Sequence, residues 1–91
     1  MENKKVRLII QGKVQGVFFR ASTKDKAKEL GLKGFVRNRQ DGAVEVVAEG
    51  DINQLQKLVD WCHIGPDLSR VDSVQSDWQP YVVQFEEFNI I

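Results

Sequence analysis

Cysteine and histidine are scarce in this chain of 91 residues, and each shortage excludes a class of structure or chemistry. Cys62 is the only cysteine and cannot form a disulfide within the chain, so we expect a reducing compartment, most simply the cytoplasm. His63 is the only histidine, and the sequence contains no Cys-x-x-Cys motif. Because these are the usual metal ligands in short motifs, the sequence predicts no metal site.

Net charge and long hydrophobic runs are also absent. The 13 basic residues balance the 13 acidic ones, so no long-range field attracts nucleic acid or a membrane. No apolar run approaches the roughly 20 residues of a spanning helix, and the first residues lead into a strand rather than into a long apolar segment. We expect one domain over residues 1–91 that acts on a small molecule. Without a heptad repeat or an obvious apolar surface patch, the simplest oligomeric state is a monomer.

Hydrophobic periodicity predicts the first strand and both helices. Residues 6 to 10 alternate with a period of two, as expected for a strand with one buried face. Thr23, Ala27 and Leu30 recur at helical spacing, which predicts an amphipathic helix that ends at Gly31. A second helix is expected between a capping Asp51 and a stop at Gly65-Pro66. Its predicted buried positions are Ile52, Leu55, Leu58, Val59 and Cys62.

Two strands at residues 33–39 and 43–49 flank Asp41-Gly42, which is a strong hairpin signal. A two-residue loop would pair Asn38 with Glu45, whereas a three-residue loop with a bulge would pair it with Val46. The second register is preferred because it places Asn38 at the end of one mostly apolar face. The other members of that face are Val36, Val44, Val46 and Ala48.

The remaining strands are expected at residues 71–79 and, as a short closing edge strand, around Phe85, Phe88 and Ile90. The resulting order is strand, helix, strand, strand, helix, strand. This order predicts an α+β fold of the split β-α-β, or ferredoxin-like, type, with both helices on one face of an antiparallel sheet. Many unrelated functions share this fold, so function must be inferred from the site.

The segment Gly12-Lys13-Val14-Gln15-Gly16-Val17-Phe18-Phe19-Arg20 joins the first strand to the first helix. Its two glycines let the backbone turn sharply and approach a ligand, and the start of a helix leaves several N–H groups free. Such a loop suits an anion, and Arg20 lies where the loop enters the helix. The segment therefore predicts a phosphate site in which the guanidinium closes over a group held by backbone amides.

Two motifs carry a family resemblance. They are Gly12-x-Val14-Gln15-Gly16-Val17-x-Phe19-Arg20 and Gly31-Leu32-x-Gly34-x-Val36-x-Asn38-x-x-Asp41-Gly42-x-Val44-Glu45. The similarity continues through Gly50 to Gly65-Pro66 and Val71 and leaves only the C-terminal end loosely matched. On these residues the chain resembles the acylphosphatase family.

The resemblance implies the ferredoxin-like fold and hydrolysis of the mixed anhydride between a carboxylate and phosphate, without a cofactor. The substrate would be a small acyl phosphate, and inorganic phosphate would be a product. The family's functional arginine and asparagine fall on Arg20 and Asn38, and Asn38 would orient the attacking water. Phosphate would be held by Arg20 together with the backbone amides of Gln15, Gly16, Val17, Phe18 and Phe19.

Other interpretations remain beside this one. A module that binds a phosphorylated or carbamoylated ligand without turnover would share the resemblance, and hydrolysis of a synthetic acyl phosphate would separate the two. An RNA-binding surface is disfavoured, because residues 33–36 resemble an RNA recognition strand only weakly and lie on the wrong strand. Without the resemblance, we would interpret Arg20 as a solvated cation at the start of a helix and Asn38 as a residue that makes local hydrogen bonds.

The other reactive side chains have simpler explanations. Cys62 lies on the apolar side of the second helix and is expected in the core. His63 is expected at the solvated end of that helix, where the helix dipole favours a cation. Asp41 is explained by the turn and Glu45 by strand alternation, so neither needs a chemical role.

Overall fold

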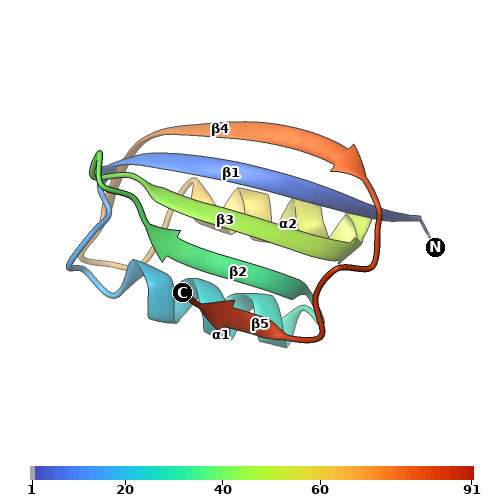
Figure 1. The fold of residues 1–91 in the computed structure, drawn as a ribbon. Coiled ribbons are helices and arrows are strands. Elements are labelled where there is room, and N and C mark those ends of the chain that lie inside the picture. Colours follow the sequence, from blue (N-terminus) through green and yellow to red (C-terminus); the bar gives the residue numbers. More distant parts are fainter. Residues whose placement is uncertain (1) are drawn as a thin grey trace.

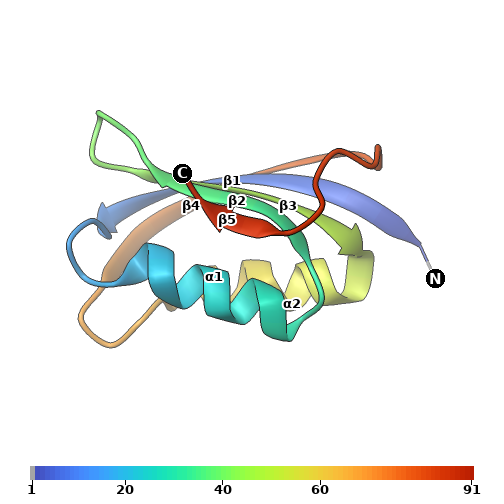
Figure 2. The ribbon, with the colours of Figure 1, turned by 60° about the horizontal axis from the view of Figure 1, so that its bottom comes forward.

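The computed structural model describes residues 2–91, which form a five-stranded sheet with both helices on one face (Figures 1 and 2). The order of strands across the sheet is β4-β1-β3-β2-β5. This arrangement confirms the predicted ferredoxin-like α+β fold. In chain order the elements are β1 (Asn3–Lys13), α1 (Phe19–Glu29), β2 (Lys33–Asn38), β3 (Val44–Asp51), α2 (Ile52–Cys62), β4 (Arg70–Pro80) and β5 (Phe88–Ile90).

The last strand departs from the predicted sheet. The first four strands pair antiparallel, as expected, but β5 pairs parallel to β2, so the sheet is mixed. Alternation along a strand defines the face that it buries but not the direction in which it joins a sheet edge. β5 is also shorter than expected, because it begins at Phe88, and Phe85 lies before it, packed against Phe35.

The hairpin between β2 and β3 has neither of the registers considered from the sequence. Asn38 pairs with Val44, so the preferred pairing with Val46 is wrong. The Arg39 amide donates to the Ala43 carbonyl at 2.8 Å, so the three-residue loop is residues 40–42, one residue earlier than the loop that would pair Asn38 with Val46. The Asp41 carboxylate closes the turn by accepting a hydrogen bond from the Ala43 amide at 3.1 Å. The register differs from the preferred one by an even number of residues, so the predicted buried face is unchanged.

Both predicted helix boundaries are confirmed by their capping contacts. After α1, Gly31 has a φ of 72°, and the Leu32 amide donates to the Ala27 carbonyl at 2.9 Å, as in a Schellman motif. At the start of α2, the Asp51 carboxylate accepts a hydrogen bond from the Gln54 amide at 3.3 Å. Among residues 2–91, neither helix is both long and apolar enough to cross a membrane.

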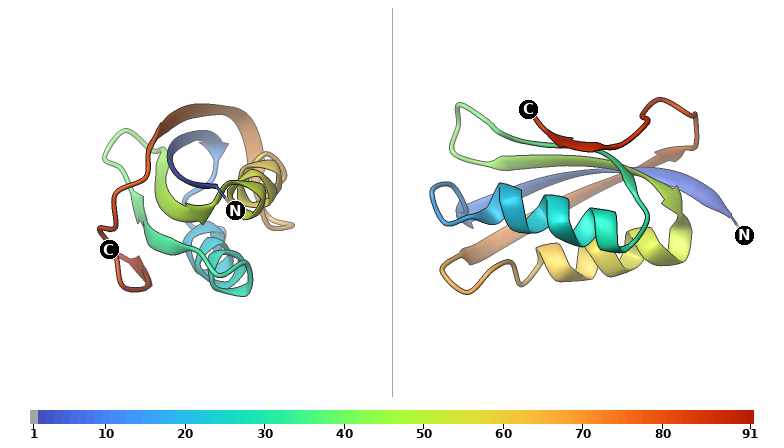
Figure 3. Two further views of the ribbon diagram at one scale, coloured as in Figure 1. Left: turned by 90° about the vertical axis from the view of Figure 1, so that its right-hand side faces the viewer. Right: turned by 90° about the horizontal axis from the view of Figure 1, so that it is seen from below.

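Both helices lie against one face of the sheet (Figure 3), and the hydrophobic core fills the space between these layers. Leu8 of β1 is fully buried there, and so is Cys62 of α2. The burial of Cys62 confirms its assignment to the core and raises the pKa of its thiol to about 12. His63 is exposed at the end of α2, as predicted, whereas Ile52 is only half-buried.

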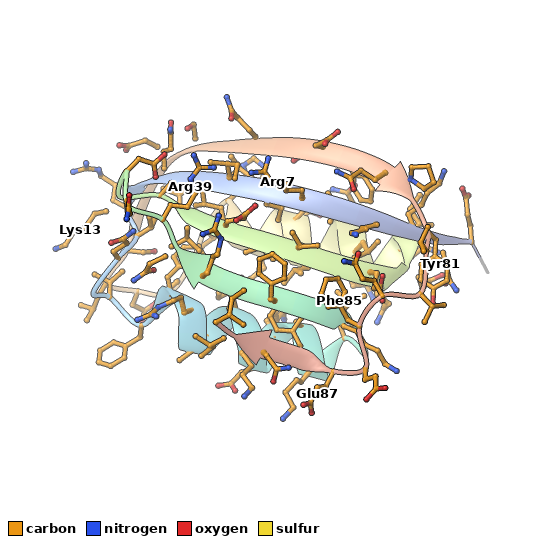
Figure 4. All side chains as sticks on the ribbon, in the orientation of Figure 1. Arg7, Lys13, Arg39, Tyr81, Phe85 and Glu87 are labelled. Carbon is orange, nitrogen blue, oxygen red and sulfur yellow. The ribbon has the colours of Figure 1, made fainter. Side chains whose placement is uncertain are left out.

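Residues 81–87, which we call the C-terminal strap, lead from β4 at one edge of the sheet to β5 at the other (Figure 1). The buried Glu49 carboxylate holds the strap by accepting hydrogen bonds from the backbone amides of Gln84 and Phe85, at 3.1 and 2.9 Å. Figure 4 shows Phe85 on the sheet face turned away from the helices. The strap thereby brings β5 alongside β2 and close to α1.

Candidate active site

The loop between β1 and α1 contains two residues in the left-handed region. Gly16 has a φ of 74°, and Phe18 has a φ of 66°. Phe18 is the one non-glycine residue with a positive φ among residues 2–91. This conformation costs about 1 to 3 kcal/mol in a residue with a side chain, and such residues cluster at functional sites. Turns that enter the left-handed region can direct successive N–H groups to a common point and form an anion-binding concavity.

Within residues 2–91, the backbone amides of residues 15–19 donate no hydrogen bond to a protein acceptor. Phe18 occupies the N-cap position of α1 and supplies no capping side chain. The first regular helical bond here runs from the Ser22 amide to the Phe18 carbonyl, at 3.0 Å. Free amides at the positive end of a helix favour an anion. The free donors predicted for this loop are therefore present.

Arg20 and Asn38 line the same cavity, which has a volume of about 340 Å³. Arg20 is exposed in the first turn of α1, and its side chain makes no salt bridge or hydrogen bond with the other residues of the described range. Asn38 is the last residue of β2. The remaining lining residues are Val14, Gly16, Phe18, Phe19, Ala21 and Ile90.

Two of the predicted loop residues, Gln15 and Val17, do not line this cavity. Val17 is only 5% exposed, and its side chain belongs to the core. Only backbone amides were predicted to bind phosphate at these positions, so the direction of the side chains leaves that prediction as it stands.

Asn38 presents an unsatisfied acceptor. Its Oδ1 atom is buried and has no hydrogen-bond partner within residues 2–91. An acceptor left in this state costs about 1 to 3 kcal/mol, which a donating water molecule would remove. Because Asn38 follows Val36 on the helix-facing side of β2, it lies at the end of the buried face, as predicted.

The side chain of Gln15 joins the two halves of the site. Its Nε2 atom donates to the Arg39 carbonyl at 2.8 Å and to the Ala43 carbonyl at 3.0 Å. Both carbonyls belong to the turn that follows Asn38, so the loop between β1 and α1 is tied to the hairpin that carries the asparagine. Only the backbone amide of Gln15 was predicted to take part in the site, because nothing in the local pattern shows which distant carbonyls the side-chain amide meets.

Ile90 is another residue whose place at the site was not predicted. It pairs with Val36 near the end of β2, and β5 packs beside α1. Ile90 and Phe18 are 40% and 72% exposed, respectively, and both border the cavity that holds Arg20. The sequence indicated a closing edge strand around Ile90 but not the neighbours that it would meet.

Glu45 lies outside the cavity and is paired with two arginines. It is 5% exposed and accepts hydrogen bonds from Nε of Arg7, at 2.6 Å, and from Nε of Arg37. Burial raises the pKa of Glu45, but the hydrogen bonds and charges of the two arginines outweigh that effect and bring the pKa below its ordinary value. Arg7 lies on the sheet face opposite the helices (Figure 4).

Within residues 2–91, no three His, Cys, Asp or Glu side chains are grouped so that they could hold a metal.

Comparison with known proteins identifies the family. The acylphosphatase family model matches residues 6–90. The acylphosphatase of Pelotomaculum thermopropionicum is 47% identical over 90 residues, which cover 99% of this chain and 98% of the relative. The crystal structure of acylphosphatase from Bacillus subtilis superposes with a TM-score of 0.93 at 35% identity and covers 97% of this chain and 98% of that one. The crystal structure of full-length HypF in its phosphate- and nucleotide-bound form also superposes, with a TM-score of 0.86 at 25% identity. The matched region covers 99% of this chain but only 12% of the HypF chain. The chain belongs to the acylphosphatase family.

Proposed function

We propose that this acylphosphatase holds the phosphoryl group of a small acyl phosphate with the backbone amides of residues 15–19 and the Arg20 guanidinium, and directs water at it with Asn38. The observation that carries the proposal is that Arg20 and Asn38, from α1 and β2, line one cavity with the loop. The water oxygen bonds to phosphorus while the bond from phosphorus to the bridging oxygen breaks. The carboxylate leaves with the electron pair.

Electrostatics support the assignment of Arg20. A cation in the first turn of a helix opposes the helix dipole, and a bound anion offsets that cost of a few tenths of a kcal/mol up to about 1 kcal/mol. Phosphoryl transfer depends mainly on positioning and on charge stabilisation around the phosphoryl oxygens. Free amides and an unpaired guanidinium supply both. A carboxylate is a good leaving group, so no general acid is needed.

The buried, unpartnered Oδ1 of Asn38 supports its assignment to the water. A water that donates to this atom is held in one orientation, which lowers the barrier through entropy rather than through proton transfer. With no general base assigned, the proton of the attacking water passes to an oxygen of the substrate's own phosphate. The products are a carboxylate and inorganic phosphate.

The proposed reaction needs no cofactor. We propose further that residues 1–91 form one domain, which acts as a monomer in the cytoplasm and has neither nucleic acid nor a membrane as a partner. The zero net charge and the single cysteine support these parts. We expect full activity after prolonged chelation, and loss of activity that a divalent ion restores would contradict the mechanism. Light scattering of the purified protein tests the monomer.

Two substitutions test the division of labour. Arg20→Ala removes the charged half of the phosphate clamp, so phosphate affinity and turnover should both fall, with the contact worth roughly 1.5 to 3 kcal/mol. Asn38→Ala leaves the clamp in place and should nearly abolish turnover while phosphate still binds with close to wild-type affinity. Calorimetric titration with inorganic phosphate, beside rates with benzoyl phosphate, separates the two effects.

Lys24→Ala is the matched control, because Lys24 is a cation of α1 outside the cavity. It should retain wild-type binding and rate. If Asn38→Ala lost phosphate binding as severely as Arg20→Ala, the assigned roles would be wrong. A wild-type protein that binds phosphate but hydrolyses no acyl phosphate would instead favour the binding-module alternative.

A further inference from the structure

We propose that Phe18 and Ile90 form an apolar rim that binds the acyl part of the substrate, so that the enzyme selects acyl phosphates whose acyl group is apolar and about the size of an aromatic ring. The inference rests on the proposed function, because it takes the phosphate end to be held by the loop and Arg20. It identifies residues that bind the acyl end of the substrate, for which the sequence motifs indicate none.

The rim combines two residues from opposite ends of the chain. Phe18 is the left-handed N-cap residue of α1, and Ile90 is the last residue of β5. β5 runs parallel to β2, so its C-terminal end points the same way as the end of β2 that carries Asn38 (Figure 1). Along β5, Phe88 is buried, and Ile90, two residues on, shares its helix-facing side. Ile90 therefore extends the core-facing row of β5 into the cavity.

Both side chains expose apolar surface where the substrate binds. Phe18 is 72% exposed and Ile90 is 40% exposed, while Val14, on the same cavity wall, is 1% exposed. Scattered apolar side chains are common on protein surfaces, but these two border the cavity that contains the arginine and the asparagine. An aromatic residue held at a positive φ also carries a conformational cost that glycine at this position would avoid. An apolar acyl group would cover both side chains.

The cavity is larger than phosphate requires. Inorganic phosphate has five non-hydrogen atoms, so it needs less than about 150 Å³ even if each atom is given the roughly 30 Å³ that a whole water molecule occupies in the liquid. The cavity has a volume of about 340 Å³. Only the bridging oxygen separates phosphorus from the acyl carbon, so the acyl group must occupy the space next to the phosphate. The polar groups of the cavity are assigned to phosphate and water, which leaves the apolar rim for the acyl group.

The test compares benzoyl phosphate with acetyl phosphate, which share the reacting group and differ in apolar size. Ile90→Thr keeps a β-branched residue in the edge strand and replaces apolar surface with a hydroxyl group. Phe18→Asn removes the ring and substitutes a residue that tolerates a positive φ. Ile91→Thr is the matched control, because Ile91 is the adjacent exposed isoleucine and does not line the cavity. For each protein we measure kcat/KM with both substrates and the inhibition constant of inorganic phosphate.

We expect the wild type to favour benzoyl phosphate. Each rim variant should lower the ratio of kcat/KM for benzoyl phosphate to that for acetyl phosphate by about 3- to 10-fold, because a partly open apolar contact is worth less than a closed pocket. Inhibition by phosphate should stay within about twofold of wild type in Ile90→Thr, and Ile91→Thr should keep the wild-type ratio. An unchanged ratio in both rim variants, with both substrates still hydrolysed, would overturn the rim and leave the proposed function standing. A wild type that hydrolyses neither substrate would refute the proposed function itself.

Discussion

At the scale of single residues, the site depends on a side chain that makes no contact with the proposed substrate. Gln15 uses both hydrogens of its amide group to hold the turn that follows Asn38. The phosphate and the attacking water would be bound by different elements, the loop with α1 and the end of β2. Their relative position therefore depends on how firmly Gln15 connects these two elements. We therefore treat the Gln15 side chain as a positioning group, beside the proposed phosphate contact of its backbone amide.

Replacing Gln15 with leucine keeps the size of the side chain and removes both hydrogen bonds. The expected loss of unfolding free energy is about 1 to 3 kcal/mol, since each bond contributes about 0.5 to 1.5 kcal/mol. A loosened hairpin should lower kcat by about 10- to 100-fold, because small displacements of a reacting group have effects of this size. Phosphate inhibition should change little, since the loop amides and Arg20 remain.

Gln75→Leu is the control for this change, because Gln75 is exposed on β4 and does not line the cavity. Chemical denaturation and steady-state kinetics measure the two effects separately. Equal losses of kcat and of phosphate affinity in Gln15→Leu would show that the residue acts on the phosphate loop rather than on the hairpin.

Glu45 gives a pH dependence at the same scale. Burial raises its pKa, but the two arginines lower it by more, to below the ordinary value. Its ion pairs with Arg7 and Arg37 therefore stabilise the fold above the ordinary pKa of a glutamate and are lost as the pH falls through the lowered pKa. Glu45→Gln should cost about 1 to 3 kcal/mol at pH 7. The difference between wild type and variant should shrink steadily as the pH falls below that ordinary pKa. Denaturation curves over this range measure it, and a difference that stayed constant would contradict the role of the charge.

At the scale of elements, the position of β5 depends on the C-terminal strap. Glu49 is 3% exposed and accepts two backbone hydrogen bonds from the strap, and the Gly34 amide donates to the Glu87 carbonyl at 3.0 Å. Phe85 packs on Phe35 with 5.8 Å between ring centroids. A three-residue strand at a sheet edge has few bonds of its own, so these contacts determine whether β5 remains paired.

Glu49→Ala should release the strap more than it unfolds the domain. We expect the amides of Gln84, Phe85 and β5 to exchange with deuterium at least about tenfold faster, while the amides of β1 change less, because local opening needs less free energy than global unfolding. Glu49→Gln keeps an acceptor and should show a smaller effect. Equal acceleration throughout the chain would mean that Glu49 supports the whole fold rather than the strap.

At the scale of the whole molecule, one core joins the sheet to both helices. Leu8→Ala truncates a fully buried side chain at its centre and should cost about 2 to 5 kcal/mol. Cys62 reports this loss, because its buried thiol, with a pKa of about 12, should react with alkylating reagents only when the protein unfolds. Labelling should therefore become at least about 30-fold faster in Leu8→Ala. Leu68→Ala, at a residue 63% exposed, should leave the rate near that of wild type, and an unchanged rate in Leu8→Ala would contradict the central position of Leu8.

The local features of this protein follow from its sequence. Alternation in β1, the helical spacing that ends at Gly31, the Asp51 cap and the free amides of the phosphate loop all depend on residues a few positions apart. Short-range sterics and hydrogen bonds determine such features almost independently of the rest of the chain. The fold class could therefore be predicted, and the family motifs indicated Arg20 and Asn38.

Tertiary structure decided the features that depend on distant partners. The turn between β2 and β3 is placed one residue earlier than predicted, and Gln15 donates hydrogen bonds to the Arg39 and Ala43 carbonyls at its two ends. β5 joins β2 in parallel because the strap crosses to the far edge of the sheet, and this path brings Ile90 to the cavity. Contacts between residues so far apart leave no period in the local sequence, because they arise from packing and chain routing rather than from short-range preference.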